Sequence, residues 1–266
     1  MNLKEYAKHY LVIFLIMWFA LGQFAYFSIP GIFEYAGYAG NFDLAGFIGY
    51  IFYLGAPVIS FFILLYVVKF YGLSSFEGRV WLFITIGMGF FCIGEGFFVY
   101  YDLFSDEAPF PSIADAFYLL AYLPLTIGFI YKAKYAKVQW EMKKNVMIGG
   151  ILFIFLVSTI IFVVIPIIQD DTYGFIETAV SLAYPSLDVI LLAFALFVAF
   201  YWGASVAKGW YFISVGIICM AIADTLFAAL EWQGHYFYPI DLLFMLNYLL
   251  IAAGAFYQKK LHEEFI

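Results

Sequence analysis

Long apolar segments alternate with short polar ones along the chain. Eight apolar runs are each about 20 residues long, the length that an α-helix needs to cross roughly 30 Å of hydrocarbon. The runs are residues 10–27, 47–71, 80–101, 113–131, 146–168, 179–202, 210–230 and 240–257. The pattern predicts an all-α integral membrane bundle of about eight transmembrane helices. We expect residues 1–266 to form a single membrane domain, because the chain leaves no room for a sizeable soluble domain.

Two of these runs contain a proline near the middle, Pro57 in the second run and Pro185 in the sixth. Proline has no backbone N–H to donate and its ring crowds the preceding turn. We therefore expect a kink or a local break in the helix at each of these positions.

Composition supports a membrane environment. Of the 266 residues, 66% are apolar and 12% are charged, whereas soluble domains are about half apolar and a quarter charged. The lipid bilayer is therefore the expected partner of most of the surface, and we expect no nucleic-acid partner. Cys92 and Cys219 both lie in apolar runs, which favours two buried free thiols over a disulfide.

The basic residues occur only at alternate ends of the predicted spans. All twelve can be placed on one side of the membrane. They are Lys4, Lys8, Lys69, Arg79, Lys132, Lys134, Lys137, Lys143, Lys144, Lys208, Lys259 and Lys260. Because cytoplasmic loops carry the excess of Lys and Arg, this pattern predicts a multi-pass protein of the cell membrane with both termini in the cytoplasm.

The two halves of the chain resemble each other. Trp81 begins the stretch Trp-Leu-Phe-Ile-Thr-Ile-Gly, and Trp210 begins Trp-Tyr-Phe-Ile-Ser-Val-Gly. Further matched pairs are Glu95 with Asp224, Asp115 with Asp241, Tyr122 with Tyr248, and Pro57 with Pro185. This predicts parallel-oriented four-helix repeats at about residues 10–132 and 146–260, related by a pseudo-twofold axis along the membrane normal. Chance similarity among apolar segments is the alternative, and it stays open outside the third, fourth, seventh and eighth runs.

Five carboxylates fall inside the apolar runs. They are Glu95, Asp115, Asp188, Asp224 and Asp241. A charge in hydrocarbon costs at least about 2.5 kcal/mol, so such side chains normally face the bundle interior or water. Glu95 and Asp224 each lie 16 residues from a basic residue, which is about 24 Å along a helix. The same count places all five acids in one layer, in the outer third of the membrane.

Two interpretations of these acids remain open. Asp115, Asp188 and Asp241 follow prolines, so they are candidates for the first turn of a helix, where the dipole favours an acid. Glu95 and Asp224 lie near the outgoing ends of their runs, where the dipole is unfavourable. The second interpretation is an outward-facing acidic cavity with aromatic walls.

Tyrosines accompany the acids at helical spacing. Asp115, Tyr118 and Tyr122 share one helix face, and Asp241 and Tyr248 repeat the ends of that stripe. No Lys or Arg lies at this depth to neutralise the acids. They must be protonated, hydrogen-bonded to neighbours such as these tyrosines and Asn247, or neutralised by a bound cation, with Glu95 and Asp224 as the candidate metal ligands.

Several kinds of enzyme and cofactor site are missing from the sequence. His9, His235 and His262 all lie outside the apolar runs, which argues against a haem or a zinc centre within the membrane. The sequence contains no phosphate-binding loop, nucleophile elbow or dinucleotide fingerprint. We therefore expect no cofactor and no enzymatic activity.

The stretch from Pro111 to Tyr122 reads Pro-Ser-Ile-Ala-Asp-Ala-Phe-Tyr-Leu-Leu-Ala-Tyr. It resembles a stretch in the multi-span sensory modules that precede histidine kinases, diguanylate cyclases and phosphodiesterases in prokaryotes. The resemblance covers about residues 80–258 and implies an eight-span sensory or ligand-binding domain. It makes Asp115, Tyr118, Tyr122, Asp224 and Asp241 motif positions. Because the sequence ends at Ile266, soon after the last run, we expect a stand-alone module or a piece of a longer protein.

These observations lead to a non-enzymatic membrane sensor or ligand-binding module. It would take a cationic or small-molecule ligand from outside and signal to a cytoplasmic partner. The expected ligand-binding residues are Glu95, Asp115, Tyr118, Tyr122, Asp188, Asp224, Asp241 and Tyr248. One alternative is a cation or proton transporter or channel that uses the same acids. Another is a lipid-modifying enzyme with a carboxylate as general acid or base.

Overall fold

The chain folds as a helical bundle in a computed structural model that describes residues 10–24, 44–105, 109–134, 140–169, 174–201, 207–231 and 239–264. Within these ranges the structure contains helices and no strands. Seven of the helices are long and apolar enough to cross a membrane. The prediction of an all-α, multi-pass membrane bundle is therefore confirmed.

The long helices follow the apolar runs closely. They are α2 (Leu44–Tyr71), α3 (Phe76–Phe104), α4 (Ile113–Lys134), the continuous α5–η1–α6 rod (Met142–Gln169), α7 (Phe175–Tyr201), α8 (Ala207–Glu231) and α9 (Pro239–Glu264). The first helix, Tyr10–Phe24, is shorter than the others. Residues 25–27 of the first predicted run lie outside the described residues, so an eighth span stays a prediction. The cytoplasmic placement of both termini also stays a prediction.

The helices do not break at Pro57 and Pro185, because α2 and α7 continue through them, and a kink there stays a prediction. One missing N–H is tolerated within a bundle when neighbouring groups satisfy the backbone. An irregular turn occurs elsewhere, in the π-helical segment η1 (Ile160–Val164) between α5 (Met142–Thr159) and α6 (Ile165–Gln169).

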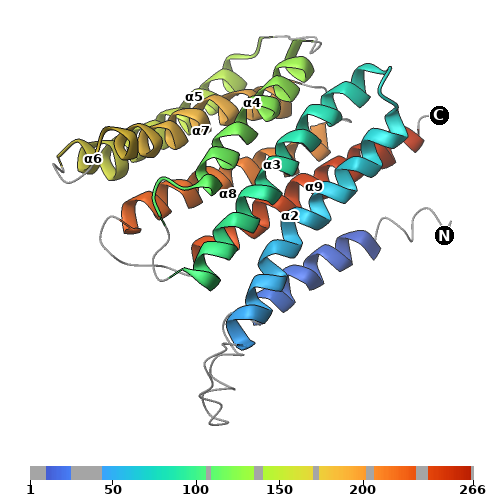
Figure 1. Cartoon of the computed structure of the whole chain (residues 1–266). Helices are drawn as coiled ribbons and strands as arrows, with labels where there is room; N and C mark the ends of the chain where they lie inside the picture. The colour runs from blue at the N-terminus through green and yellow to red at the C-terminus, as the bar shows by residue number, and fades with distance from the viewer. Residues whose placement is uncertain are drawn as a thin grey trace.

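The helices pack in a definite order (Figure 1). α3 packs most extensively on α4, and α8 on α9. α2 lies against α3 and α9, and α7 lies against α8 and α4, so the two pairs close into one bundle. The α5–η1–α6 rod packs mainly on α7. The first helix lies beside the beginning of α2, where the Trp18 indole donates to the Phe52 carbonyl at 3.0 Å.

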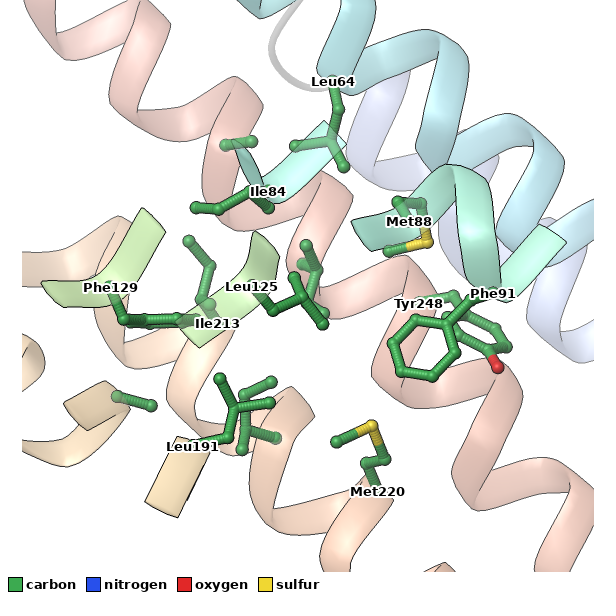
Figure 2. Close-up of a cluster of buried hydrophobic side chains, with 14 of the residues drawn as sticks. Leu64, Ile84, Met88, Phe91, Leu125, Phe129, Leu191, Ile213, Met220 and Tyr248 are labelled. Atoms are coloured by element: carbon green, nitrogen blue, oxygen red, sulfur yellow. The ribbon is translucent and has the colours of Figure 1, made fainter. Parts of the chain in front are cut away.

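Apolar side chains fill the middle of the bundle (Figure 2). Ile84 and Met88 from α3, Leu125 from α4, Leu191 from α7 and Ile213 from α8 are fully buried there. Glycines bring α8 and α9 together near the start of α8. A Cβ added to Gly254 would lie 2.5 Å from the carbonyl oxygen of Gly209, so a side chain there would separate α8 from α9.

Basic residues gather at one end of the bundle. Lys132, at the end of α4, forms an ion pair with Glu77 at the start of α3, at 2.5 Å. Its ammonium lies 5.4 Å from the ring centroid of Trp210 at the start of α8. Lys259, near the end of α9, lies 4.5 Å from the ring centroid of Phe70 at the end of α2. These contacts join the ends of five helices.

Candidate functional site

A cavity of about 260 Å³ lies at the end of the bundle opposite these lysines, where α3 and α8 end and α4 and α9 begin. Its walls combine aromatic rings with carboxyl and hydroxyl groups. The lining residues are Tyr53, Phe91, Glu95, Phe98, Tyr101, Pro109, Phe110, Ser112, Ala114, Asp115, Tyr118, Tyr122, Ile167, Ser181, Tyr184, Met220, Asp224, Phe227, Ala228, Asp241, Phe244 and Tyr248. Seven of the eight predicted ligand-binding residues are among them.

Glu95 accepts hydrogen bonds from tyrosines of two other helices. Tyr118 of α4 donates its hydroxyl to Oε2 at 2.8 Å, and Tyr248 of α9 donates to Oε1 at 2.5 Å. Tyr53, from α2, lines the same cavity and lies close to this carboxyl group. Glu95 is only 2% exposed. The tyrosines thus replace the water that a buried carboxylate would lose.

A second cluster joins α4, α7 and α8. Tyr122 lies with its hydroxyl 2.7 Å from Asp188 Oδ1 and 3.1 Å from Asp224 Oδ2. The two carboxyl groups are themselves within hydrogen-bonding reach of each other. Asp224 lines the cavity, whereas Asp188 is fully buried behind it. Asp188 is therefore the one predicted ligand-binding residue that does not line the cavity.

Asp115 begins α4 and faces the cavity at the same time. Its Oδ2 accepts from the backbone N–H of Ser112 at 2.6 Å, and the hydroxyl of Ser112 bonds the N–H of Ala114 at 3.1 Å. This reciprocal arrangement is a capping box. Its other oxygen, Oδ1, accepts from the hydroxyl of Tyr184 in α7 at 2.8 Å. Asp115 thus links the start of α4 to the middle of α7.

The structure decides between the interpretations of the acids residue by residue. Asp115 and Asp241 lie in the first turns of α4 and α9, so the helix-end interpretation is confirmed for them. It is wrong for Asp188, because Pro185 lies inside α7 and leaves Asp188 in the helix interior. Both first-turn acids also line the cavity with Glu95 and Asp224.

One smaller expectation, a hydrogen bond from Asn247 to the acids, is wrong. Asn247 is fully buried, but its amide has no hydrogen-bond partner among the described residues. It points toward Gly216 of α8 rather than to any of the acids.

Sequence reasoning missed most of the aromatic residues of the site. Three of them lie next to predicted site residues: Tyr53 lies close to Glu95, Tyr184 bonds Asp115, and Phe91 lies among three tyrosine rings. Tyr184 carries a detectable signal, since it precedes Asp188 by four residues and so shares its helix face. Tyr53 and Phe91 carry no such signal in a chain with 23 tyrosines and 34 phenylalanines.

The charges around the cavity have one sign. Its lining includes four carboxyl groups, from Glu95, Asp115, Asp224 and Asp241, and no Lys, Arg or His among the described residues. Aromatic and apolar walls keep the local dielectric low, which strengthens attraction for a positive ligand. The arrangement can therefore hold a cation and orient hydrogen-bond donors.

Neither cysteine forms a disulfide, as expected: Cys92 is half-buried and Cys219 is buried, and both thiols are free. Within the described ranges no group of three or more His, Cys, Asp or Glu side chains is placed to hold a metal ion. A metal site on Glu95 and Asp224 would have to be completed by water or by tyrosine oxygens.

Comparisons with protein-family models, with curated proteins and with solved structures find no match to this chain. Only the geometry of the site therefore indicates a function. The resemblance to prokaryotic sensory modules stays an expectation.

Proposed function

We propose that the protein is a non-enzymatic membrane sensor or ligand-binding module. A small ligand enters the acidic cavity from outside, and the change passes along the helices to a partner at their basic, cytoplasmic ends. The observation that carries this proposal is the position of the cavity. It lies at the end without lysines, and the fully buried apolar side chains of Met88, Leu125 and Leu191 separate it from the basic end.

The inner half of the bundle favours sensing over transport. A transport path needs polar groups that an ion can reach. Here Thr85 donates to the carbonyl of Trp81, Ser214 to that of Ala195, and Ser60 to that of Ala56 or of Tyr248. Their hydroxyl hydrogens are thus engaged by the backbone.

The lining also favours binding over catalysis. An enzyme that acts on lipids would need a nucleophile or a metal beside its acid and base. The hydroxyl of Ser112 is engaged in the helix cap with Asp115. Ser181 is the other serine of the lining, which holds no histidine, lysine or cysteine to activate it among the described residues.

Contacts between the halves support the proposed pseudo-twofold repeat and suggest how a signal would spread. Tyr248 of the second half bonds Glu95 of the first, and Tyr122 of the first half bonds Asp224 of the second. The two pairs are matched positions, so each half supplies the donor for the other. A ligand that displaces either tyrosine would loosen one half from the other.

The proposal is tested by filling the cavity and measuring a distance between two helix ends at the basic end of the bundle. Spin labels at Lys134→Cys and His262→Cys, with both native cysteines replaced by alanine, report the distance between the ends of α4 and α9. Ala228→Trp places a ring in the cavity, whereas Ile222→Trp adds one to an exposed position of the same helix. We expect the distance distribution to shift with the first substitution only.

An unchanged distribution for Ala228→Trp would refute signal transmission. Transport is tested separately in vesicles that contain the protein and a pH-sensitive dye. We expect an imposed proton gradient to persist as in empty vesicles. Dissipation that Glu95→Gln abolishes would favour the transporter alternative.

A further inference from the structure

We propose that the cavity takes a monovalent organic cation with an apolar or aromatic body, and that Glu95 is its counter-charge. This inference rests on the proposed function and names the ligand class of the same site. It predicts that an amine or quaternary ammonium compound binds in the cavity, and that a metal ion or a neutral small molecule does not.

The surroundings of Glu95 favour a negative charge that lacks a positive partner. Its hydroxyl donors are Tyr118 and Tyr248, one for each carboxylate oxygen. An ionised carboxylate only accepts hydrogen bonds, so two converging donors match that form. No Lys, Arg or His lines the cavity among the described residues. A positive ligand would therefore complete the site.

The donor set argues against a metal ion. Calcium takes six to eight oxygen ligands, and magnesium requires a near-octahedral set. The oxygens of Glu95 are already bonded to the hydroxyls of Tyr118 and Tyr248, whose hydrogens face the carboxylate. In the described part of the chain no cluster of three metal-ligating side chains exists. A metal would have to share these oxygens with the tyrosines and still find several further ligands, whereas an organic cation needs only the negative charge beside it.

The aromatic residues suit an organic cation. The ring of Phe91 lies beside Glu95 on α3, with its centroid 6.3 Å from Tyr118, 6.1 Å from Tyr122 and 5.8 Å from Tyr248. Figure 2 shows the rings of Phe91 and Tyr248 lying together. Aromatic faces attract a cation within about 6 Å, and this is how quaternary ammonium groups are recognised. Phe227 and Phe244 extend the apolar wall for the rest of the ligand.

The size of the cavity limits the ligand. Its volume of about 260 Å³ is just below the range of about 300–1,000 Å³ that is typical of pockets for drug-sized ligands. One ring and one ammonium group would fill such a space. A peptide or an intact phospholipid would not.

The test uses benzyltrimethylammonium as probe and neopentylbenzene, its uncharged isostere, as the matched compound. Binding to the purified full chain in nanodiscs is measured by calorimetry and by thermal stabilisation. Glu95→Gln removes the charge and keeps the shape. Asp102→Asn removes an exposed acid from the same helix and is the matched control.

We expect the ammonium probe to bind at least tenfold more tightly than its isostere. Glu95→Gln should weaken that binding at least tenfold, and Asp102→Asn should leave it unchanged. Equal binding of the neutral compound, unaltered binding by Glu95→Gln, competition by calcium chloride at constant ionic strength, or no probe binding at all would overturn the ligand class. The spin-label result with Ala228→Trp stands apart from these outcomes, so a failure of the ligand class is distinguishable from a failure of the sensor function.

Discussion

The indole of Trp81 stacks on the indole of Trp210, with ring centroids 5.2 Å apart and planes inclined by 19° (ring pair of α3 and α8). These are the residues that begin the two similar sequence stretches. Both are fully buried, and Lys132 lies over the ring of Trp210. Matched residues that touch must lie near any axis that relates the two halves. The stack therefore supports the pseudo-twofold arrangement proposed above.

Removing either ring should destabilise the bundle, and the two losses of unfolding free energy should be less than additive. Offset aromatic pairs contribute about 0.5–1.5 kcal/mol beyond the area that they bury. We expect the loss for Trp81→Leu with Trp210→Leu to be smaller than the sum of the single losses by that amount. Reversible unfolding in detergent measures it. Trp140→Leu, at an exposed position, serves as control, and strict additivity would contradict the stack.

Close packing of α8 on α9 should make Gly254 intolerant of a side chain. A Cβ there would meet the Gly209 carbonyl oxygen at 2.5 Å and Ile213 Cγ1 at 2.6 Å. Backbone cannot yield as a flexible side chain would, so Gly254→Ala should cost about 1–3 kcal/mol. Gly96→Ala meets nothing within 4 Å and should stabilise α3 by up to about 1 kcal/mol. The order of the two melting temperatures checks this.

Neutralising the paired acids should not unfold the protein. Glu95 and Asp224 line one cavity, so their charges repel each other when both are ionised. Glu95→Gln with Asp224→Asn removes any such repulsion and keeps the shapes. We expect an equal or higher melting temperature for the double variant, and no change for Asp102→Asn. A marked fall would mean that the carboxylates hold the bundle together.

Labelling of single cysteines from each side of the membrane tests which end of the bundle faces the cytoplasm. In a chain without its native cysteines, Ser105→Cys and Gly174→Cys should react with a membrane-impermeant maleimide on intact cells. Lys134→Cys and His262→Cys should react only after the membrane is opened, because the basic end faces the cytoplasm. Reaction of both groups from one side would disprove the assignment.

Local spacing predicted much of the site, because helical geometry acts within one segment. Asp115, Tyr118 and Tyr122 recur at three and four residues, so they had to share a face, and all three line the cavity. The contact of Tyr53 with Glu95 was not predictable in this way. It depends on which helices become neighbours, and apolar runs of similar composition leave that choice open.

Local spacing also could not predict that Asp188 would be buried behind the cavity. Asp188 has the same spacing signals as an acid in a first turn, since it follows Pro185 and Ser186. In the bundle α7 continues through the proline, and packing against α4 and α8 covers the side chain. The helix-end interpretation failed there because tertiary contacts, rather than the proline, decide where this helix begins.

The contact of Tyr122 with two carboxyl groups has a consequence for isotope exchange. A hydroxyl has one hydrogen, so Tyr122 can donate to Asp188 or to Asp224 at any instant, and the other contact needs a hydrogen on the carboxyl itself. On Asp188 that hydrogen is enclosed, because this side chain is fully buried, whereas on Asp224 it lies at the cavity. In heavy water a hydrogen on Asp224 would be replaced by deuterium through the cavity, and one held on Asp188 only when α4, α7 and α8 separate. The rate of deuterium exchange in the vibrational band of this carboxyl pair therefore tells which of the two acids holds the hydrogen.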